Sequence, residues 1–153
     1  NKENEEMSKS PVYDETNEEA NYNHLISAKF AKYEIIHYVD YITLVVNKYS
    51  FDYKTIITTL GSDVYVFDKT SGKLYNNDEL LSKFSVNKDD INEKVKTYLN
   101  DKNLVSEENK IDVEKTISNN TKYNLYVDKL GRLVISILVK AEKSDYNDII
   151  VLS

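Results

Sequence analysis

The chain has 153 residues with a formal charge of −6 at pH 7, a length typical of one domain around one hydrophobic core. Its 20 Lys and Arg residues are outnumbered by 26 Asp and Glu residues and form no concentrated basic segment, which argues against a nucleic-acid partner. Cysteine is absent, so disulfides, thiolate nucleophiles and cysteine-based metal sites are excluded.

Residues 1–21 are acidic and contain almost no large apolar side chains. A segment of this composition cannot offset its ordering entropy by burial, and we predict a flexible acidic linker followed by a single domain over residues 22–153. No apolar run approaches the roughly 18–20 residues that a bilayer crossing needs. The chain starts at Asn1, and we therefore expect a secreted form whose signal peptide or membrane anchor lies outside it.

Two β-strands are predicted between residues 28 and 50, joined by a turn at residues 39–40. β-Branched and aromatic residues dominate this stretch and partly alternate with polar ones, as in strands with one buried face. Two further strands are expected over residues 54–60 and 62–67. Gly61 stands between them, where the chain would turn or bulge, and the result is an antiparallel meander.

Residues 68–72 read Asp-Lys-Thr-Ser-Gly and form a strong turn signal, because Asp and Ser bond to their own backbone and Gly accepts a positive φ. Residues 128–131 carry a similar Asp-to-Gly turn. After the first turn, Asn76 or Asn77 can cap a short helix that extends to Phe84.

A longer helix is predicted from a cap at Asn87 or Asp89 to about Lys102. Helical spacing places four apolar residues on one face, which should pack on the sheet; they are Ile91, Val95, Tyr98 and Leu99. A third, acidic helix is expected to begin at Ser106 and to fade near Asn120.

The last third of the chain returns to strand patterns. Strands are predicted over residues 123–127, 132–140 and 146–152, with a turn between the first two. The predicted fold class is therefore α+β, a single domain in which an antiparallel β-sheet carries two or three packed helices.

Patterns that would indicate catalysis or cofactor binding are missing. The two histidines, His24 and His37, lie on different predicted elements, and His-Glu-x-x-His spacing is absent, which argues against a zinc site. There is no Gly-x-Ser-x-Gly elbow, and glycines 61, 72 and 131 are too scattered for a phosphate-binding loop. We expect no catalytic residues, no metal and no cofactor.

Paired carboxylates are the one enzymatic arrangement that linear order leaves open, because acid and base need only converge in space. Four aspartates lie near predicted strand ends, namely Asp40, Asp52, Asp63 and Asp68. Ordinary turn chemistry explains aspartates at such positions. The pair Asp40 and Asp63 represents the alternative hypothesis of a carbohydrate-active accessory domain.

Tyrosines cluster in or beside the first predicted strands: Tyr33, Tyr38, Tyr41, Tyr49, Tyr53, Tyr65 and Tyr75. Tyrosine is common at recognition surfaces because it offers a large rigid contact area with a polar tip. Packing within strands favours the same residue, and we expect packing to account for most of these side chains.

Several stretches together suggest a family. They are YEIIHY (33–38), YITLVV (41–46), VYVFDKTSGKL (64–74) followed by DELL (78–81), the helix over 91–99, and YNLYVDKLGRLVI (123–135). In their order and spacing they resemble the RsiV-like extracytoplasmic domain of unknown function, which occurs in anti-sigma factors and secreted enzymes of Gram-positive bacteria. The resemblance covers residues 33–152.

This resemblance implies a non-catalytic α+β domain that is secreted or anchored as a lipoprotein or membrane protein at the cell surface. The best-understood type recognises host lysozyme, and an acidic domain suits a basic lysozyme. We therefore expect an extracytoplasmic binding or sensing module for a protein or cell-wall ligand, attached to the membrane only through an anchor outside this chain. The alternatives are an accessory domain of a secreted cell-wall hydrolase and a surface or spore-layer protein that self-associates through strand edges.

Overall fold

A computed structural model describes residues 28–51, 57–105, 108–120 and 122–153. The predicted linker over residues 1–21 and the expected domain start at residue 22 lie outside the described residues. The elements are β1 (Ala28–Tyr38), β2 (Tyr41–Phe51), β3 (Thr58–Asp68), β4 (Leu74–Tyr75), α3 (Asn77–Lys83), α4 (Asp89–Val105), α5 (Val113–Asn119), β5 (Asn124–Val127), β6 (Leu133–Val139) and β7 (Tyr146–Val151). The predicted α+β class is confirmed, with the strands divided between two antiparallel sheets.

The large sheet has the strand order β1-β2-β3-β4. The β1–β2 hairpin turns at residues 39–40 as predicted, with Tyr38 opposite Tyr41. The expected break between strands 54–60 and 62–67 is wrong, because residues 58–68 form one strand. Gly61, at φ +102°, lies beside a shift in register between Lys48 and Tyr49 of β2. A bulge of this kind bends a strand without ending its pairing.

The predicted turn over residues 68–72 is held by one side chain. The Asp68 carboxylate accepts the backbone N–H groups of Ser71 at 2.8 Å and Thr70 at 3.1 Å, and Gly72 has φ +72°. The turn returns the chain along β3 as the two-residue strand β4, which the sequence did not predict. At the equivalent turn of β5–β6, Asp128 accepts the N–H groups of Leu130 and Arg132.

The helices begin at short polar side chains. Asn76 caps α3 in a capping box with Glu79, and α4 buries Ile91, Val95 and Leu99 as the spacing predicted. Ser106, where the third helix was expected to begin, lies outside the described residues, and residues 108–112 after it are not helical. Helix α5 begins at Val113, because the Asp112 side chain accepts the N–H of Lys115 and supplies the cap that the acidic run alone does not.

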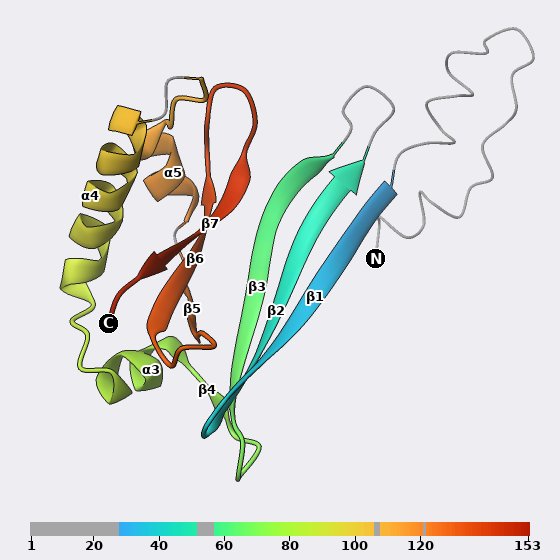
Figure 1. The fold of residues 1–153 in the computed structure, drawn as a ribbon, viewed down its shortest axis with the longest axis vertical. Helices are drawn as coiled ribbons and strands as arrows, with labels where there is room; N and C mark the ends of the chain where they lie inside the picture. Colours follow the sequence, from blue (N-terminus) through green and yellow to red (C-terminus); the bar gives the residue numbers. More distant parts are fainter. Residues whose placement is uncertain (1–27, 52–56, 106–107, 121) are drawn as a thin grey trace, which may run out of the picture.

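Most of the hydrophobic core surrounds the small sheet, whose strand order is β5-β6-β7. Residues 133–137 of β6 are all buried, so both faces of this strand are covered. Figure 1 shows the small sheet, drawn in orange and red, between helix α4 and the large sheet. The molecule therefore has three layers, with the small sheet in the middle.

Polar side chains connect the two sheets. The Thr43 hydroxyl on β2 donates to the Val127 carbonyl at 3.0 Å, and the hydroxyls of Ser62 and Ser136 are hydrogen-bonded at 2.8 Å. The Asn124 amide also donates to the Ser62 carbonyl at 2.7 Å. Hydrogen bonds are directional, so these bonds between the buried faces specify one relative position of the two sheets. Apolar contacts alone would specify this position less strongly.

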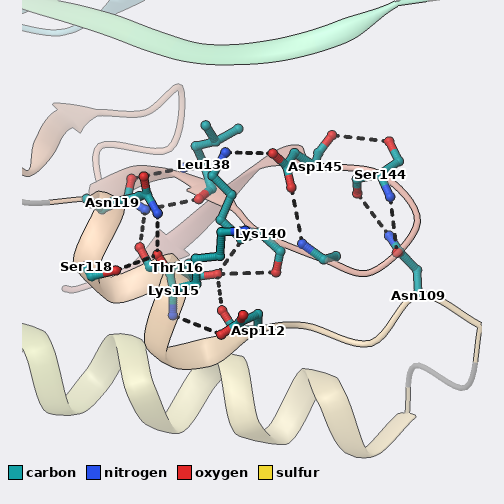
Figure 2. Close-up of polar contacts among 12 residues, drawn as sticks. Asn109, Asp112, Lys115, Thr116, Ser118, Asn119, Leu138, Lys140, Ser144 and Asp145 are labelled. Atoms are coloured by element: carbon teal, nitrogen blue, oxygen red, sulfur yellow. Dashed lines mark hydrogen bonds and ion pairs between the residues drawn. The ribbon is translucent and has the colours of Figure 1, made fainter. Parts of the chain in front are cut away.

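Helix α5 packs against β6 beyond the last β5–β6 pair, Asn124 with Ser136. Figure 2 shows the polar contacts in this region, which include Thr116, Leu138 and Lys140. The Leu138 N–H donates to the Asn120 carboxamide oxygen, and the Leu138 carbonyl accepts from the Asn120 amide. The Lys140 N–H donates to the Thr116 hydroxyl at 2.9 Å. These side chains satisfy backbone groups that a longer β5 would otherwise pair, so this dense polar cluster is structural.

Candidate functional site

The two faces of the large sheet have different surroundings. Thr43, Val45, Ser62 and Val66 are buried against the small sheet. Since successive side chains of a strand point to opposite faces, their neighbours in β2 and β3 point away from the small sheet. The apolar side chains of this outer face are Tyr33 and Ile35 of β1, Ile42, Leu44 and Val46 of β2, Tyr65 and Phe67 of β3, and Leu74 of β4.

Several of these side chains are strongly exposed. The exposed fraction is 75% for Tyr33, 53% for Ile35, 41% for Tyr65 and 50% for Leu74. Exposed apolar residues scattered singly are normal, but a contiguous apolar surface marks a contact site. Among the described elements, the small sheet and the three helices lie on the β3 side of the large sheet, while β1 borders the molecule on the other side (Figure 1).

Cross-strand register makes the outer face contiguous. Leu44 lies opposite Ile35 of β1 and Tyr65 of β3, which forms an apolar row at the centre of the face. The next row places Ile42 between His37 and Phe67. Side chains directly opposite one another have Cβ atoms about 4.5–5.5 Å apart, so the rows pack into one surface.

An exposed ion pair bounds one end of the outer face. Lys48 of β2 contacts Asp63 of β3 at 2.9 Å, and both side chains are nearly half exposed. Such a surface pair adds little stability. Its charges of opposite sign leave this end of the face electrically balanced.

The opposite end of the large sheet carries a packed aromatic cluster on its inner side. The ring of Tyr41 lies 5.8 Å from that of Tyr75 and 6.0 Å from that of Phe84. The Lys83 ammonium lies 5.0 Å from the Tyr75 ring centre. The hydrogen bond to Asp68, together with desolvation, raises the pKa of the Tyr75 hydroxyl. This cluster attaches α3 to the sheet and is not an open site.

A surface depression lies beside this cluster. It has a volume of about 460 Å³ and is lined by residues of β4 and α3, including Lys73, Glu79 and Lys83. Lys73 and Glu79 pair with each other across it, which raises the pKa of Lys73 and lowers that of Glu79. Because its charges are already paired, this depression has little capacity to bind an ionic ligand.

The structure separates the two carboxylates of the enzymatic hypothesis. Asp40 lies at the β1–β2 turn, near the Asp68 end of β3, where the Lys69 N–H donates to its carbonyl. Asp63 is five residues from Asp68 along β3, or about 17 Å at the rise of a strand. The catalytic carboxyls of glycosidases lie about 5–9.5 Å apart, so these two do not form such a pair. Asp52 is outside the described residues.

Of the two histidines, the structure describes only His37. His37 lies opposite Ile42 on the outer face, which fits its predicted role as a cross-strand neighbour, and His24 is outside the described residues. In the described parts of the chain, no three His, Asp or Glu side chains converge to hold a metal ion. None of the described helices is long and apolar enough to cross a bilayer.

Some tyrosines of the predicted cluster pack inside the protein, and others are exposed on its surface. Tyr38, Tyr41, Tyr49 and Tyr75 make ring contacts or join the core margin, whereas Tyr33 and Tyr65 point outward; Tyr53 lies outside the described residues. The outer face itself was missed by sequence reasoning. The sequence does contain a signal for this face. β2 carries apolar residues on both of its faces, whereas a strand with one face in water alternates apolar and polar residues.

The chain matches no protein-family model, no curated protein and no solved structure.

Proposed function

We propose that the chain is a non-catalytic binding module that recognises a protein partner through the outer face of the large sheet. One observation carries this proposal: the rows centred on Leu44 and Ile42 form a contiguous, partly exposed apolar surface without a covering element among the described residues. Aromatic side chains within such a surface are typical anchors of protein interfaces.

A protein fits this face better than a cell-wall saccharide does. Sugar-binding sites combine an aromatic ring with several convergent hydrogen-bonding groups, but the central row consists of Ile35, Leu44 and Tyr65. The phenol of Tyr65 is the only polar group of this row. A flat apolar row complements the similar core of a protein–protein interface.

The partner that we propose is basic. The chain carries a net charge of −6, and a charge of this sign speeds the encounter with a positively charged protein. The resemblance to the RsiV-like domain supports the same choice, since lysozyme is a basic protein. It also supports a location outside the cytoplasm, at the surface of a Gram-positive cell, with any membrane anchor outside this chain.

The test uses lysozyme as the probe. The full chain is immobilised and lysozyme binding is followed by interferometry at about 20 mM and about 150 mM salt, because low salt exaggerates surface electrostatics. We expect saturable binding at the higher salt, with a Kd in the range of about 1–10 µM.

Two matched variants locate the binding surface. Ile35 and Ile149 are almost equally exposed, at 53% and 52%, but Ile149 lies on β7 of the small sheet. Ile35→Lys should weaken lysozyme binding at least about tenfold, because it places a charge in the centre of the apolar face, whereas Ile149→Lys should not. Equal binding by both variants, or no binding by the parent chain, contradicts the proposal, and binding of muropeptide fragments instead would identify a cell-wall ligand.

A further inference from the structure

The edge of the large sheet offers a second surface. β1 pairs along its whole length with β2, and among the described strands none pairs with its other side. An open edge of this length presents a row of backbone N–H and C=O groups that can pair with another strand. Of the described strands of the large sheet, β1 lies farthest from α4 (Figure 1).

The hairpin turn decides which backbone groups face outward. Tyr38 and Tyr41 close a two-residue turn, and in such hairpins the closing pair is hydrogen-bonded. Hydrogen-bonded and non-hydrogen-bonded pairs then alternate along the two strands. The backbone groups of Lys32, Glu34 and Ile36 therefore bond to β2. The backbone groups of Tyr33 and Ile35 accordingly point to the open side.

The side chains around Tyr33 are self-complementary. Lys32 and Glu34 flank Tyr33 and lie on the same face of β1, and both are exposed. If an identical strand pairs antiparallel about a two-fold axis at Tyr33, each Lys32 lies directly opposite Glu34 of the second copy. These are the non-hydrogen-bonded pairs, in which side chains approach most closely.

Neighbouring registers are unfavourable for the same reason. A shift that centres the pair on Lys32 places two lysines opposite each other, and one that centres it on Glu34 places two carboxylates opposite each other. Like charges in directly opposite positions destabilise a sheet. The order Lys-Tyr-Glu therefore permits self-pairing about Tyr33 and disfavours the two neighbouring registers.

We propose that two copies of the chain form a symmetric dimer by antiparallel pairing of their β1 strands about Tyr33. The partner is a second copy of this chain, and the product is one continuous eight-stranded sheet built from two four-stranded ones. An interface of this kind is isologous, which is the commonest arrangement of homodimers. The inference does not depend on lysozyme binding, because it concerns the edge of the sheet and not its outer face.

Charge reversal tests the pairing directly. Sedimentation velocity on the full chain, at loading concentrations from about 1 to about 200 µM, should show a concentration-dependent dimer. Glu34→Lys and Lys32→Glu should each weaken dimerisation at least about tenfold, because either change places two like-charged pairs in the interface. Glu93→Lys, on the exposed side of α4, changes the net charge by the same amount as Glu34→Lys and should leave the dimer intact.

Mixing the two edge variants gives the decisive result. Each alone carries like charges at positions 32 and 34, but one variant opposite the other forms complementary pairs at both positions. An equimolar mixture should therefore restore dimers, as should the double variant Lys32→Glu/Glu34→Lys. Thermal unfolding confirms that each single variant is folded. A monomeric parent chain, a dimer that Glu34→Lys does not weaken, or a mixture that stays monomeric would overturn the proposal.

Discussion

The ring of Tyr38 lies so close to Gly131 that a Cβ at this glycine would stand 2.2 Å from the ring atoms Cε1 and Cζ. Tyr38 ends β1 of the large sheet, and Gly131 lies in the turn between β5 and β6 of the small sheet. The contact therefore joins the hairpins of the two sheets at one end of the molecule. It depends on a glycine, because any side chain would occupy the space of the ring.

We predict that Gly131→Ala lowers the free energy of unfolding by about 3 kcal/mol. Its φ of +77° costs a non-glycine residue about 1–2 kcal/mol, and displacing the Tyr38 ring adds about 1–3 kcal/mol. Gly72→Ala is the control, since Gly72 has a similar φ of +72° but nothing within 4 Å of its Cβ position. Urea unfolding measures both, and equal losses would argue against the Tyr38 contact.

Asp68 should make stability depend on pH in the acid range. The Ser71 N–H and the Tyr75 hydroxyl stabilise its carboxylate and lower its pKa from 3.8 to about 2. Because the folded-state pKa is below the unfolded one, this stabilisation is present above about pH 4 and is lost as the pH falls towards 2.

Asp68→Asn should therefore lower the melting temperature near neutral pH and flatten its fall between pH 4 and pH 2. Differential scanning calorimetry across this range gives both quantities. Asp101→Asn, on the exposed surface of α4, is the matched control and should leave the profile unchanged. A profile of Asp68→Asn parallel to that of the parent chain would contradict the assignment.

Asp148 holds the C-terminal half of α4 on β7. Its carboxylate accepts from Lys102 at 2.5 Å and from the Tyr98 hydroxyl at 3.1 Å, and its side chain is 17% exposed. Although desolvation of Lys102 acts in the opposite direction, the hydrogen bond to Asp148 raises the pKa of its ammonium group. Asp148→Ala should cost about 2 kcal/mol, because two partly buried donors lose their acceptor.

The exposed pair between Lys96 and Glu114 is the comparison for Asp148. It joins α4 to α5 at 3.2 Å, and both side chains are largely in water. Glu114→Ala should therefore cost less than about 0.5 kcal/mol. Chemical denaturation of both variants tests the difference, and similar losses would contradict the assigned role of burial.

Val39 occupies a backbone conformation that a β-branched residue rarely adopts. Its φ is +37°, and its side chain is 66% exposed at the tip of the β1–β2 hairpin. Val39→Gly should raise the free energy of unfolding by about 0.5–1 kcal/mol, because relief of strain exceeds the added entropy of the unfolded chain. Val39→Ala keeps a Cβ and should gain little. A loss of stability in Val39→Gly would show that the Val39 side chain makes a stabilising contact.

Local patterns predicted most elements of the fold. The spacing of Ile91, Val95 and Leu99 predicted the buried face of α4, and the Asp and Gly residues predicted the two turns, although not the strand β4. The errors arose where one local sequence pattern is compatible with two different structures. Gly61 can end a strand or form a bulge, and pairing with β2 decided for the bulge.

The start of α5 has the same explanation. The acidic residues that follow Ser106 are compatible with a helical first turn, and so is Asp112. Asp112 acts as the cap because its own backbone N–H donates to the Lys140 carbonyl at 2.8 Å, which attaches this point of the chain to the end of β6. A partner 28 residues away in the sequence is invisible to local propensity.

By itself the sequence determined the fold class, most strands and helices, and the lack of recognisable catalytic motifs, because these depend on residue types and short-range periodicity. Only the tertiary structure decided which face of the large sheet is covered, which strand forms its edge, and that Asp40 and Asp63 lie far apart. These properties depend on how strands distant in the chain pair and pack. The Leu44 row became an exposed surface because the small sheet packs on the opposite side, against Thr43 and Val45.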